Sequence, residues 1–186
     1  ALDGARGNSG AILAQFFVGF ADGIKEKVSL TAREFAQAAI HAKGYAYDAL
    51  THPREGTILS VIKAWAESLL ESCNNSNDIL SMLSKGLEDA QISLKNTPKQ
   101  LDVLAKAGVL DAGAQGFVDL LEGINEFITS GKITESNLEL IDEDVNNIDA
   151  TTNEKYRYCT ECIIIGENIP RRKLQEILMD HGDSIV

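Results

Sequence analysis

Six apolar segments with helical spacing constrain the fold of this chain most. Between residue 9 and Gly131, apolar side chains recur every three or four residues, the spacing that gives a helix one buried face. Short polar turns separate the segments, and none of them shows the alternation typical of a strand. The sequence therefore predicts a mainly α structure, an antiparallel helical bundle or barrel. The expected helices cover about 9–25, 32–50, 58–73, 78–95, 98–106 and 113–129.

Capping residues give the expected start of four of these helices. Thr31 and Glu34 have the spacing of a capping box, in which side chain and backbone satisfy each other's hydrogen bonds. Pro98 is suited to a first helical position, because a residue there needs no backbone N–H partner within the helix. Gly131 is typical of a helix end. The expected N-caps are Thr31, then Asn77 or Ser76, then Thr97 and finally Asp111.

The character of the sequence changes after Gly131. Residues 132–154 are strongly acidic with few aromatic residues, which indicates a solvated linker after a first domain at 1–131. The stretch KYRYCTECIIIG, from residue 155, is rich in β-branched and aromatic residues and predicts a strand. Pro170 then opens a helix, and DSIV begins another strand. We expect residues 155–186 to be the start of a second, α+β domain.

Composition excludes some functions. The net charge of −11 argues against a nucleic-acid-binding surface. No run of about 18 apolar residues occurs, so no membrane span is expected. The three cysteines show no disulfide rhythm, which favours a reducing compartment, and we expect a cytoplasmic protein.

Two glycine-rich turns each open a helix: GARGNSG at 4–10 and DAGAQG at 111–116. Backbone N–H groups at a helix start carry partial positive charge, and glycine lets an anion approach them closely. The first turn is not a P-loop, because no Lys-Ser or Lys-Thr follows its last glycine. The loop REGTIL at 54–59 precedes a third helix start. The three starts could converge on one anionic ligand; the alternative is that they are ordinary caps and close helix crossings.

These stretches, taken in order, carry a family resemblance. GARGNSGAIL, REGTIL and TPKQLDVLAKAGVLDAGAQGFVDLLEGI resemble three successive motifs of the DhaL-type domain, the nucleotide-binding subunit of dihydroxyacetone kinases. The version in bacterial fatty acid kinases is the most similar. The resemblance implies an all-α barrel that binds ATP with Mg²⁺ at one end and acts as an ATP-dependent kinase. It also implies a substrate, a fatty acid presented by a DegV-like fatty-acid-binding protein.

The resemblance assigns nucleotide contacts to three turns. Arg6 is a further candidate for a phosphate contact and a catalytic role, with solvation or pairing to a carboxylate as the alternative. The implied nucleotide-binding residues are Asn8, Ser9 and Gly10 at the phosphates, Thr57 and Ile58 before the third helix, and Asp111, Ala112 and Gly113 around the nucleotide.

One family feature is missing from the sequence. The magnesium ligands of the family lie in an Asp-Gly-Asp-Thr-Gly cluster, and only the isolated Asp3 precedes the first turn here. Phosphoryl transfer depends on a metal that neutralises phosphate charge, and Mg²⁺ requires hard oxygen ligands. We therefore expect the magnesium ligands on a segment before Ala1, and these 186 residues alone to be an inactive kinase.

Three functions stay open at this point. The first is the ATP-binding part of a kinase subunit that phosphorylates a fatty acid. The second is a subunit like that of dihydroxyacetone kinase, and the third is a non-catalytic regulatory or interaction module of the same fold. We expect no nucleic-acid partner and membrane contact only through the lipid substrate, and we leave a homodimer open.

The cysteines and the aromatic residues have simpler interpretations. Cys159 and Cys162 form C-x-x-C in an expected strand, where they point to opposite faces and cannot chelate one metal together. The resemblance implies that Cys159 is a ligand of a structural Zn²⁺ whose histidine partners lie beyond Val186. Cys162 is expected to be a buried small residue. The aromatic residues expected in the core are Trp65, Phe16, Phe17 and Phe20.

Overall fold

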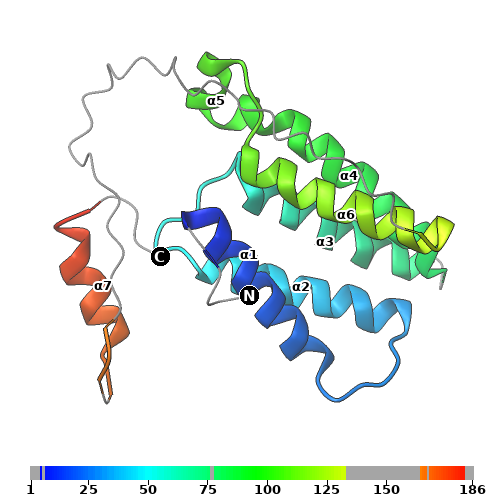
Figure 1. Cartoon of the computed structure of the whole chain (residues 1–186), viewed down its shortest axis with the longest axis horizontal. Coiled ribbons are helices and arrows are strands. Elements are labelled where there is room, and N and C mark those ends of the chain that lie inside the picture. The colour runs from blue at the N-terminus through cyan, green and yellow to red at the C-terminus, as the bar shows by residue number, and fades with distance from the viewer. Residues whose placement is uncertain (1–4, 6, 76–77, 133–163, 167, 183–186) are drawn as a thin grey trace. The chain divides into compact units, whose positions relative to one another are not determined.

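The computed structural model describes residues 5, 7–75, 78–132, 164–166 and 168–182 (Figure 1). The chain divides near residue 133 into two compact units. No strand occurs in these described ranges, so the prediction of a helical first domain is confirmed. None of the described helices is both long and apolar enough to cross a membrane. The helices are α1 (Gly7–Ile24), α2 (Ala32–Asp48), α3 (Ile58–Asn75), α4 (Ile79–Gln100), α5 (Asp102–Ala107), α6 (Ala112–Ser130) and α7 (Arg171–Met179).

The described residues of the second unit include the expected helix and only the end of the first expected strand. Helix α7 follows Pro170, as the sequence predicts. Residues 164–166, the end of the first expected strand, are not in a strand. The rest of that strand, both of its cysteines, the final DSIV and nearly all of the expected linker lie outside the described residues. The start of an α+β domain and the zinc site at Cys159 therefore stay predictions.

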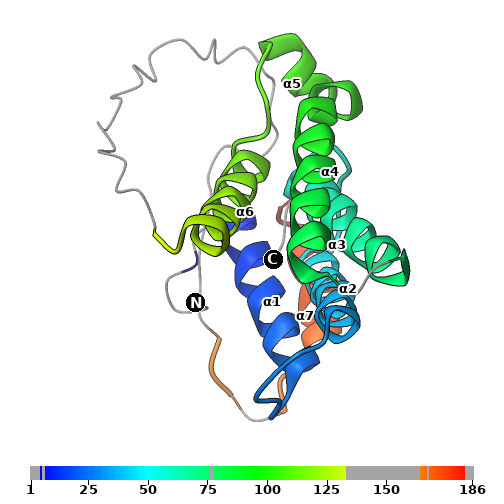
Figure 2. The same ribbon diagram turned by 90° about the vertical axis from the view of Figure 1, so that its right-hand side faces the viewer.

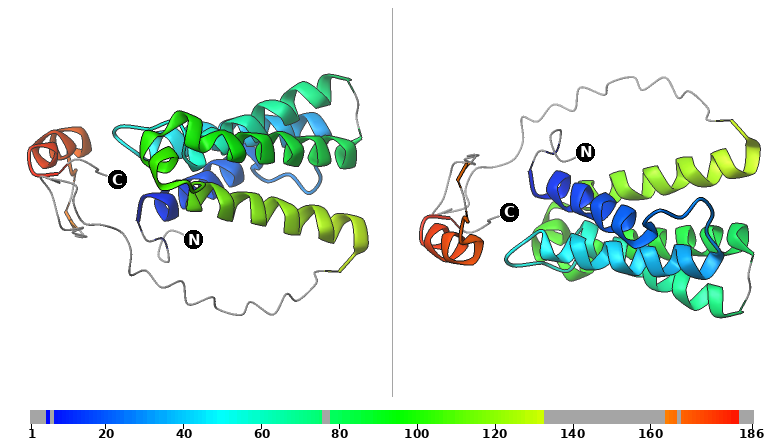
Figure 3. Two further views of the ribbon diagram at one scale, coloured as in Figure 1. Left: turned by 90° about the horizontal axis from the view of Figure 1, so that it is seen from above. Right: turned by 90° about the horizontal axis from the view of Figure 1, so that it is seen from below.

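Helix α3 supplies the centre of the first unit. It packs against α2, α4 and α6, and α1 packs against α2. Leu59, Ile62 and Leu69 of α3 are fully buried, and Trp65 is only 4% exposed. Views from two directions place α2 and α6 on different sides of α1 (Figures 2 and 3). The core prediction is confirmed for Trp65 and Phe16 and is wrong for Phe17, which is 42% exposed.

Helices α1 and α2 approach each other through small residues. A Cβ added at Gly19 would lie 2.7 Å from the Cβ of Tyr45 and 2.9 Å from the Cα of Ala42. A Cβ added at Gly23 would lie 3.0 Å from the Cα of Ala38. The contacts at Gly19 are too short for a methyl group and the contact at Gly23 is tight, so the two backbones approach closely. The buried residues of α2 are all alanines: Ala32, Ala36, Ala38, Ala39, Ala42 and Ala46.

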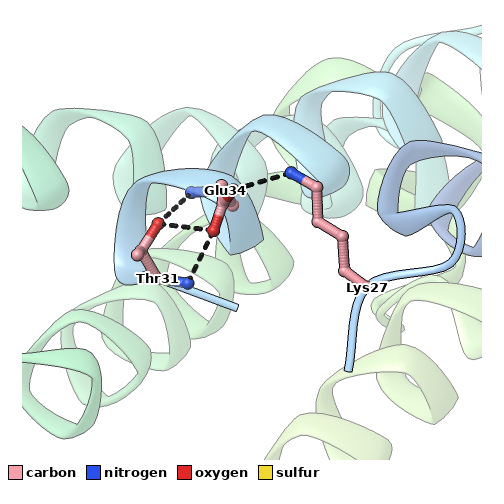
Figure 4. Close-up of polar contacts among 3 residues, drawn as sticks. All are labelled: Lys27, Thr31 and Glu34. Atoms are coloured by element: carbon pink, nitrogen blue, oxygen red, sulfur yellow. Dashed lines mark hydrogen bonds and ion pairs between the residues drawn. The ribbon is translucent and has the colours of Figure 1, made fainter. Parts of the chain in front are cut away.

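The predicted capping box at the start of α2 is present (Figure 4). The backbone N–H of Glu34 donates to the hydroxyl of Thr31 at 3.3 Å, and the carboxylate of Glu34 accepts from the backbone N–H of Thr31 at 2.9 Å. Lys27 adds an ion pair to the same carboxylate at 2.7 Å. The cap of α4 differs from the prediction: Asp78, not Asn77 or Ser76, accepts from the first turn of that helix.

Thr97 does not cap a new helix, and α4 continues through Pro98 to Gln100. Proline removes the N–H that would bind the carbonyl four residues earlier, here that of Leu94. The hydroxyl of Thr97 donates to this carbonyl at 2.8 Å instead. Because the Thr97 hydroxyl replaces the lost N–H donor, the helix accommodates Pro98 in its last turn. Helix α5 then begins only at Asp102.

Candidate functional site

The starts of α1 and α6 meet at one end of the bundle. Gly113, in the first turn of α6, lies so close to Ser9 that an added Cβ would overlap the serine hydroxyl and approach its Cβ to 2.9 Å. Both residues belong to the glycine-rich turns that the sequence predicts as an anion cradle. Gly113 therefore has a specific reason to lack a side chain, because it admits the first turn of α1.

The loop before α3 reaches the same place through Thr97. Gly56 has φ +80°, and a Cβ there would lie 3.0 Å from the carbonyl oxygen of Thr97. The hydroxyl of Thr97 accepts from the backbone N–H of Asp111, the N-cap of α6, at 3.3 Å. Thr97 itself is fully buried. The predicted convergence of the three helix starts, at Ser9, Thr57 and Asp111, is thus confirmed.

The start of α6 suits an anionic ligand. The carboxylate of Asp111 accepts from the N–H of Ala114 at 2.7 Å. The N–H groups of Ala112 and Gly113 come before the first N–H of the intrahelical ladder, that of Gln115, so the helix offers them no carbonyl partner. The helix dipole concentrates partial positive charge at this end, where the side chain of Ser9 lies directly against Gly113. Ala112 is exposed and Gly113 is half-buried.

The start of α1 offers polar groups at the surface. Asn8 and Ser9 are exposed, and Gly10 is half-buried against the backbone of Ala5. Gly7 adopts φ +63°, a left-handed conformation that favours glycine. The side chain of Ser9 therefore carries a hydroxyl at the surface next to the start of α6. Arg6, the candidate for a phosphate contact, lies outside the described residues.

The loop before α3 presents Thr57 but not the side chain of Ile58. The hydroxyl of Thr57 donates to the carbonyl oxygen of Arg54 at 2.7 Å, and the N–H of Leu59 donates to it at 3.4 Å. Ile58 is only 2% exposed, so its side chain belongs to the core. Of the two residues that the resemblance assigns here, Ile58 can meet a ligand only through its backbone.

Sequence reasoning missed a group of three polar residues behind this loop. Glu55 accepts hydrogen bonds from the hydroxyl of Tyr47, at 3.1 Å, and from the hydroxyl of Ser60. The N–H of Gly56 donates to the Ser60 hydroxyl at 2.8 Å. Burial and the charge of Glu55 raise the pKa of Tyr47 above its ordinary value. No spacing rule in the sequence points to this group, because Tyr47 is on α2 and Ser60 on α3.

The described residues hold no metal centre of their own. Among them, no three His, Cys, Asp or Glu side chains come together in a way that could bind a metal ion. Asp3, which the sequence presents alone, is not among the described residues. A ligand at the convergence of the helix starts would therefore meet hydroxyls, backbone N–H groups and helix dipoles.

A hollow, here called the aromatic groove, lies between α1 and α6, away from the helix starts. It has a volume of about 210 Å³ and an almost entirely apolar lining. The ring of Phe16 at its base lies 5.4 Å from that of Phe117 and 6.0 Å from that of Trp65. Its further lining residues are Phe17 and Phe20 of α1, Phe35 of α2, Leu83 of α4, and Leu120, Leu121, Ile124 and Asn125 of α6.

Fold and site together define a class: a helical bundle that gathers the starts of three helices at one end. The chain belongs to the DAK2 domain family, whose sequence profile matches residues 1–126. Domains of this family are nucleotide-binding modules associated with kinase subunits of the dihydroxyacetone kinase kind. The family thus agrees with the DhaL-type resemblance of the three sequence motifs.

Similar curated proteins are longer than this chain. An uncharacterised protein of Staphylococcus saprophyticus is 33% identical over the whole chain, which covers 36% of that relative. Uncharacterised proteins of Staphylococcus epidermidis and Staphylococcus aureus (strain USA300) are each 34% identical, again over the whole chain and 36% of the relative. The chain therefore spans about a third of the length of these relatives.

Proposed function

We propose that this chain is the ATP-binding part of a kinase subunit, with the phosphates of ATP at the meeting point of α1, α3 and α6. The observation that carries the proposal is the close approach of Ser9 to Gly113, with Thr97 joining the same helix end to the loop before α3. Membership of the DAK2 family supports it independently. The Ser9 hydroxyl, the backbone of Gly10 and the N–H groups of Ala112 and Gly113 would hold the phosphates, and Thr57 would contact the nucleotide.

These residues alone do not neutralise the charge of ATP. ATP brings about four negative charges, and each helix end offers roughly half a positive elementary charge. The chain itself has a net charge of −11. Mg²⁺ supplies the missing neutralisation in phosphoryl transfer, and the described residues contain no cluster to hold it. Residues 1–186 alone are therefore expected to bind ATP weakly and to transfer no phosphate.

We further propose a fatty acid as the phosphate acceptor, presented by a DegV-like carrier protein. The support is the order and the residues of the three motifs, which most resemble the fatty acid kinase version of the domain. The competing substrate is dihydroxyacetone, because the DAK2 family is associated with subunits of dihydroxyacetone kinases. Transfer of ³²P from ATP to a fatty acid loaded on such a carrier would support the first acceptor, and transfer to free dihydroxyacetone would replace it with the second.

The nucleotide site is tested by substitution at the close approach. Gly113→Val in the natural-length protein places a branched side chain against Ser9 at the start of α6, and Ser9→Ala removes one hydroxyl. We expect Gly113→Val to abolish measurable MgATP binding in calorimetry. Ser9→Ala should weaken it by about tenfold or more, since a hydrogen bond to a charged group contributes roughly 1.5–3 kcal/mol.

Gly116→Val is the matched control for the glycine variant. Gly116 lies on the same helix, and nothing approaches within 4 Å of a Cβ added there. This variant should bind MgATP like the wild type. Circular dichroism and thermal unfolding establish that all three variants are folded. Wild-type affinity in both Gly113→Val and Ser9→Ala would refute the proposed site.

A further inference from the structure

The connection between α2 and α3 is held by one carboxylate that bonds to both helices. One carboxylate oxygen of Glu55 accepts a hydrogen bond from the hydroxyl of Tyr47, and the other accepts one from the hydroxyl of Ser60. Tyr47 is in the last turn of α2, and Ser60 is in the first turn of α3. Hydrogen bonds to an ionised acceptor are stronger than those between neutral groups. The two bonds therefore tie both helix ends to the loop that carries Glu55.

The same group fixes the peptide next to the nucleotide-binding turn. The Ser60 hydroxyl accepts from the N–H of Gly56, and Ser60 is only 5% exposed. Gly56 is also packed closely against Leu101, because an added Cβ would lie 2.9 Å from the Cβ of that residue. The residue that follows is Thr57, which the proposed function places at the nucleotide. The position of Thr57 thus depends on bonds that do not involve Thr57 itself.

We propose that Glu55 is a positioning residue for the nucleotide-binding loop 54–57, which it holds through the hydroxyls of Tyr47 and Ser60. This inference rests on the proposed function. The carboxylate of Glu55 acts through the backbone of Gly56 and the start of α3, without touching the nucleotide. Loss of either hydroxyl frees the loop, so that ATP must order it on binding and binds more weakly. The competing explanation is that the group only stabilises the fold.

The chain offers matched controls for both hydroxyls. Tyr45, two residues before Tyr47 on α2, also donates its hydroxyl to a carboxylate, that of Asp22 at 3.2 Å. Ser68 lies on α3 like Ser60, is equally buried at 6% exposure, and donates to the carboxylate of Asp89 at 2.6 Å. Each control thus loses the same type of hydrogen bond, from the same helix, to a carboxylate outside the loop.

The experiment compares Tyr47→Phe and Ser60→Ala with Tyr45→Phe and Ser68→Ala in the natural-length protein. The dissociation constant of MgATP is measured by calorimetry, and thermal unfolding is followed for each variant. We expect the dissociation constant to rise about fivefold or more in the loop pair, as loss of a charge-assisted hydrogen bond implies, and to stay within about twofold in the control pair. Melting temperatures should fall in both pairs.

Glu55→Gln provides an independent arm, because Glu55 is exposed and its replacement keeps the shape of the side chain. It should weaken MgATP binding while the protein stays folded, even if a variant of the buried Ser60 unfolds. Lower melting temperatures with unchanged affinity in Tyr47→Phe and Glu55→Gln would overturn the inference and leave the proposed function intact. A wild-type protein without affinity for MgATP would overturn both.

Discussion

The two sides of helix α1 are packed in opposite ways. Toward α2, Gly19 and Gly23 leave so little room that a single added carbon would meet the partner at 2.7–3.0 Å. Toward α6, large aromatic side chains line a groove of about 210 Å³. One side is thus closed at the level of the backbone, and the other is left partly unfilled by side chains.

The contrast shows that side-chain size, not hydrophobicity, sets how closely this helix packs. Glycine and alanine let backbones touch, and the alanine face of α2 is fully buried although it offers little apolar surface. Phe16 and Phe117 instead meet through their rings, in an edge-to-face contact with centroids 5.4 Å apart. A substitution of similar size should therefore have very different effects on the two sides.

The largest effect is expected from Gly19→Ala. The new methyl group would lie 2.9 Å from the Cα of Ala42, which is backbone and cannot rotate away. Overpacking of this kind costs about 1–3 kcal/mol. This cost must exceed the gain of up to about 1 kcal/mol that alanine brings to a helix interior. We expect urea unfolding to show a net loss of about 1–2 kcal/mol.

Gly44→Ala is the control for this substitution. Gly44 lies on α2, and nothing is within 4 Å of a Cβ added there. The helix propensity of alanine should then stabilise the protein by about 0.5–1 kcal/mol. Equal stability of the two variants would show that the contact between α1 and α2 is not closed by the glycines.

Helix starts could be predicted from sequence where one residue decides them and not where tertiary contacts do. The capping box at Thr31 depends on local spacing alone, and it was found as predicted. Thr97 has the sequence of an N-cap, but its hydroxyl binds the Leu94 carbonyl and the N–H of Asp111 fourteen residues on. Because the second partner is distant in sequence, local rules place the helix boundary wrongly.

The candidate site shows the same limit. Glycine turns predicted the convergence at Ser9 and Gly113, since both the turn and the helix that follows are local patterns. The role of Glu55 was missed, because its donors come from two helices joined by a loop whose path no periodicity encodes. Phe17 was expected in the core because helical spacing predicts the apolar face but not whether a neighbour covers all of it.

The second-largest effect on stability is expected at the start of α2, the helix on the closed side of α1. Thr31→Ala removes the side chain that caps Glu34 and should cost about 1 kcal/mol in unfolding free energy. This cap should also depend on pH. The ion pair with Lys27 and the hydrogen bonds from Thr31 lower the pKa of Glu34 from 4.5 to about 2.

The direction of the pH dependence follows from that lowered pKa. The ionised form of Glu34 is favoured in the folded state, so its contribution is complete above about pH 4.5 and is lost as the pH falls toward 2. Glu34→Gln, which does not titrate, should flatten this part of the stability profile. A variant with the same acid dependence as the wild type would show that Glu34 contributes nothing to it.

The smallest effect is expected on the open side, from Ile124→Phe. Ile124 lines the aromatic groove and is 42% exposed, so a larger side chain there has both the groove and the solvent to enter. We expect a change within about 0.5 kcal/mol in either direction, as for a substitution that creates neither cavity nor clash. Ala42→Val, which also enlarges an apolar side chain but on the fully buried face of α2, should instead destabilise the protein by about 1–2 kcal/mol, within the range for overpacking. If both variants lost stability equally, the groove would be closed in solution, and the contrast between the two sides of α1 would fail.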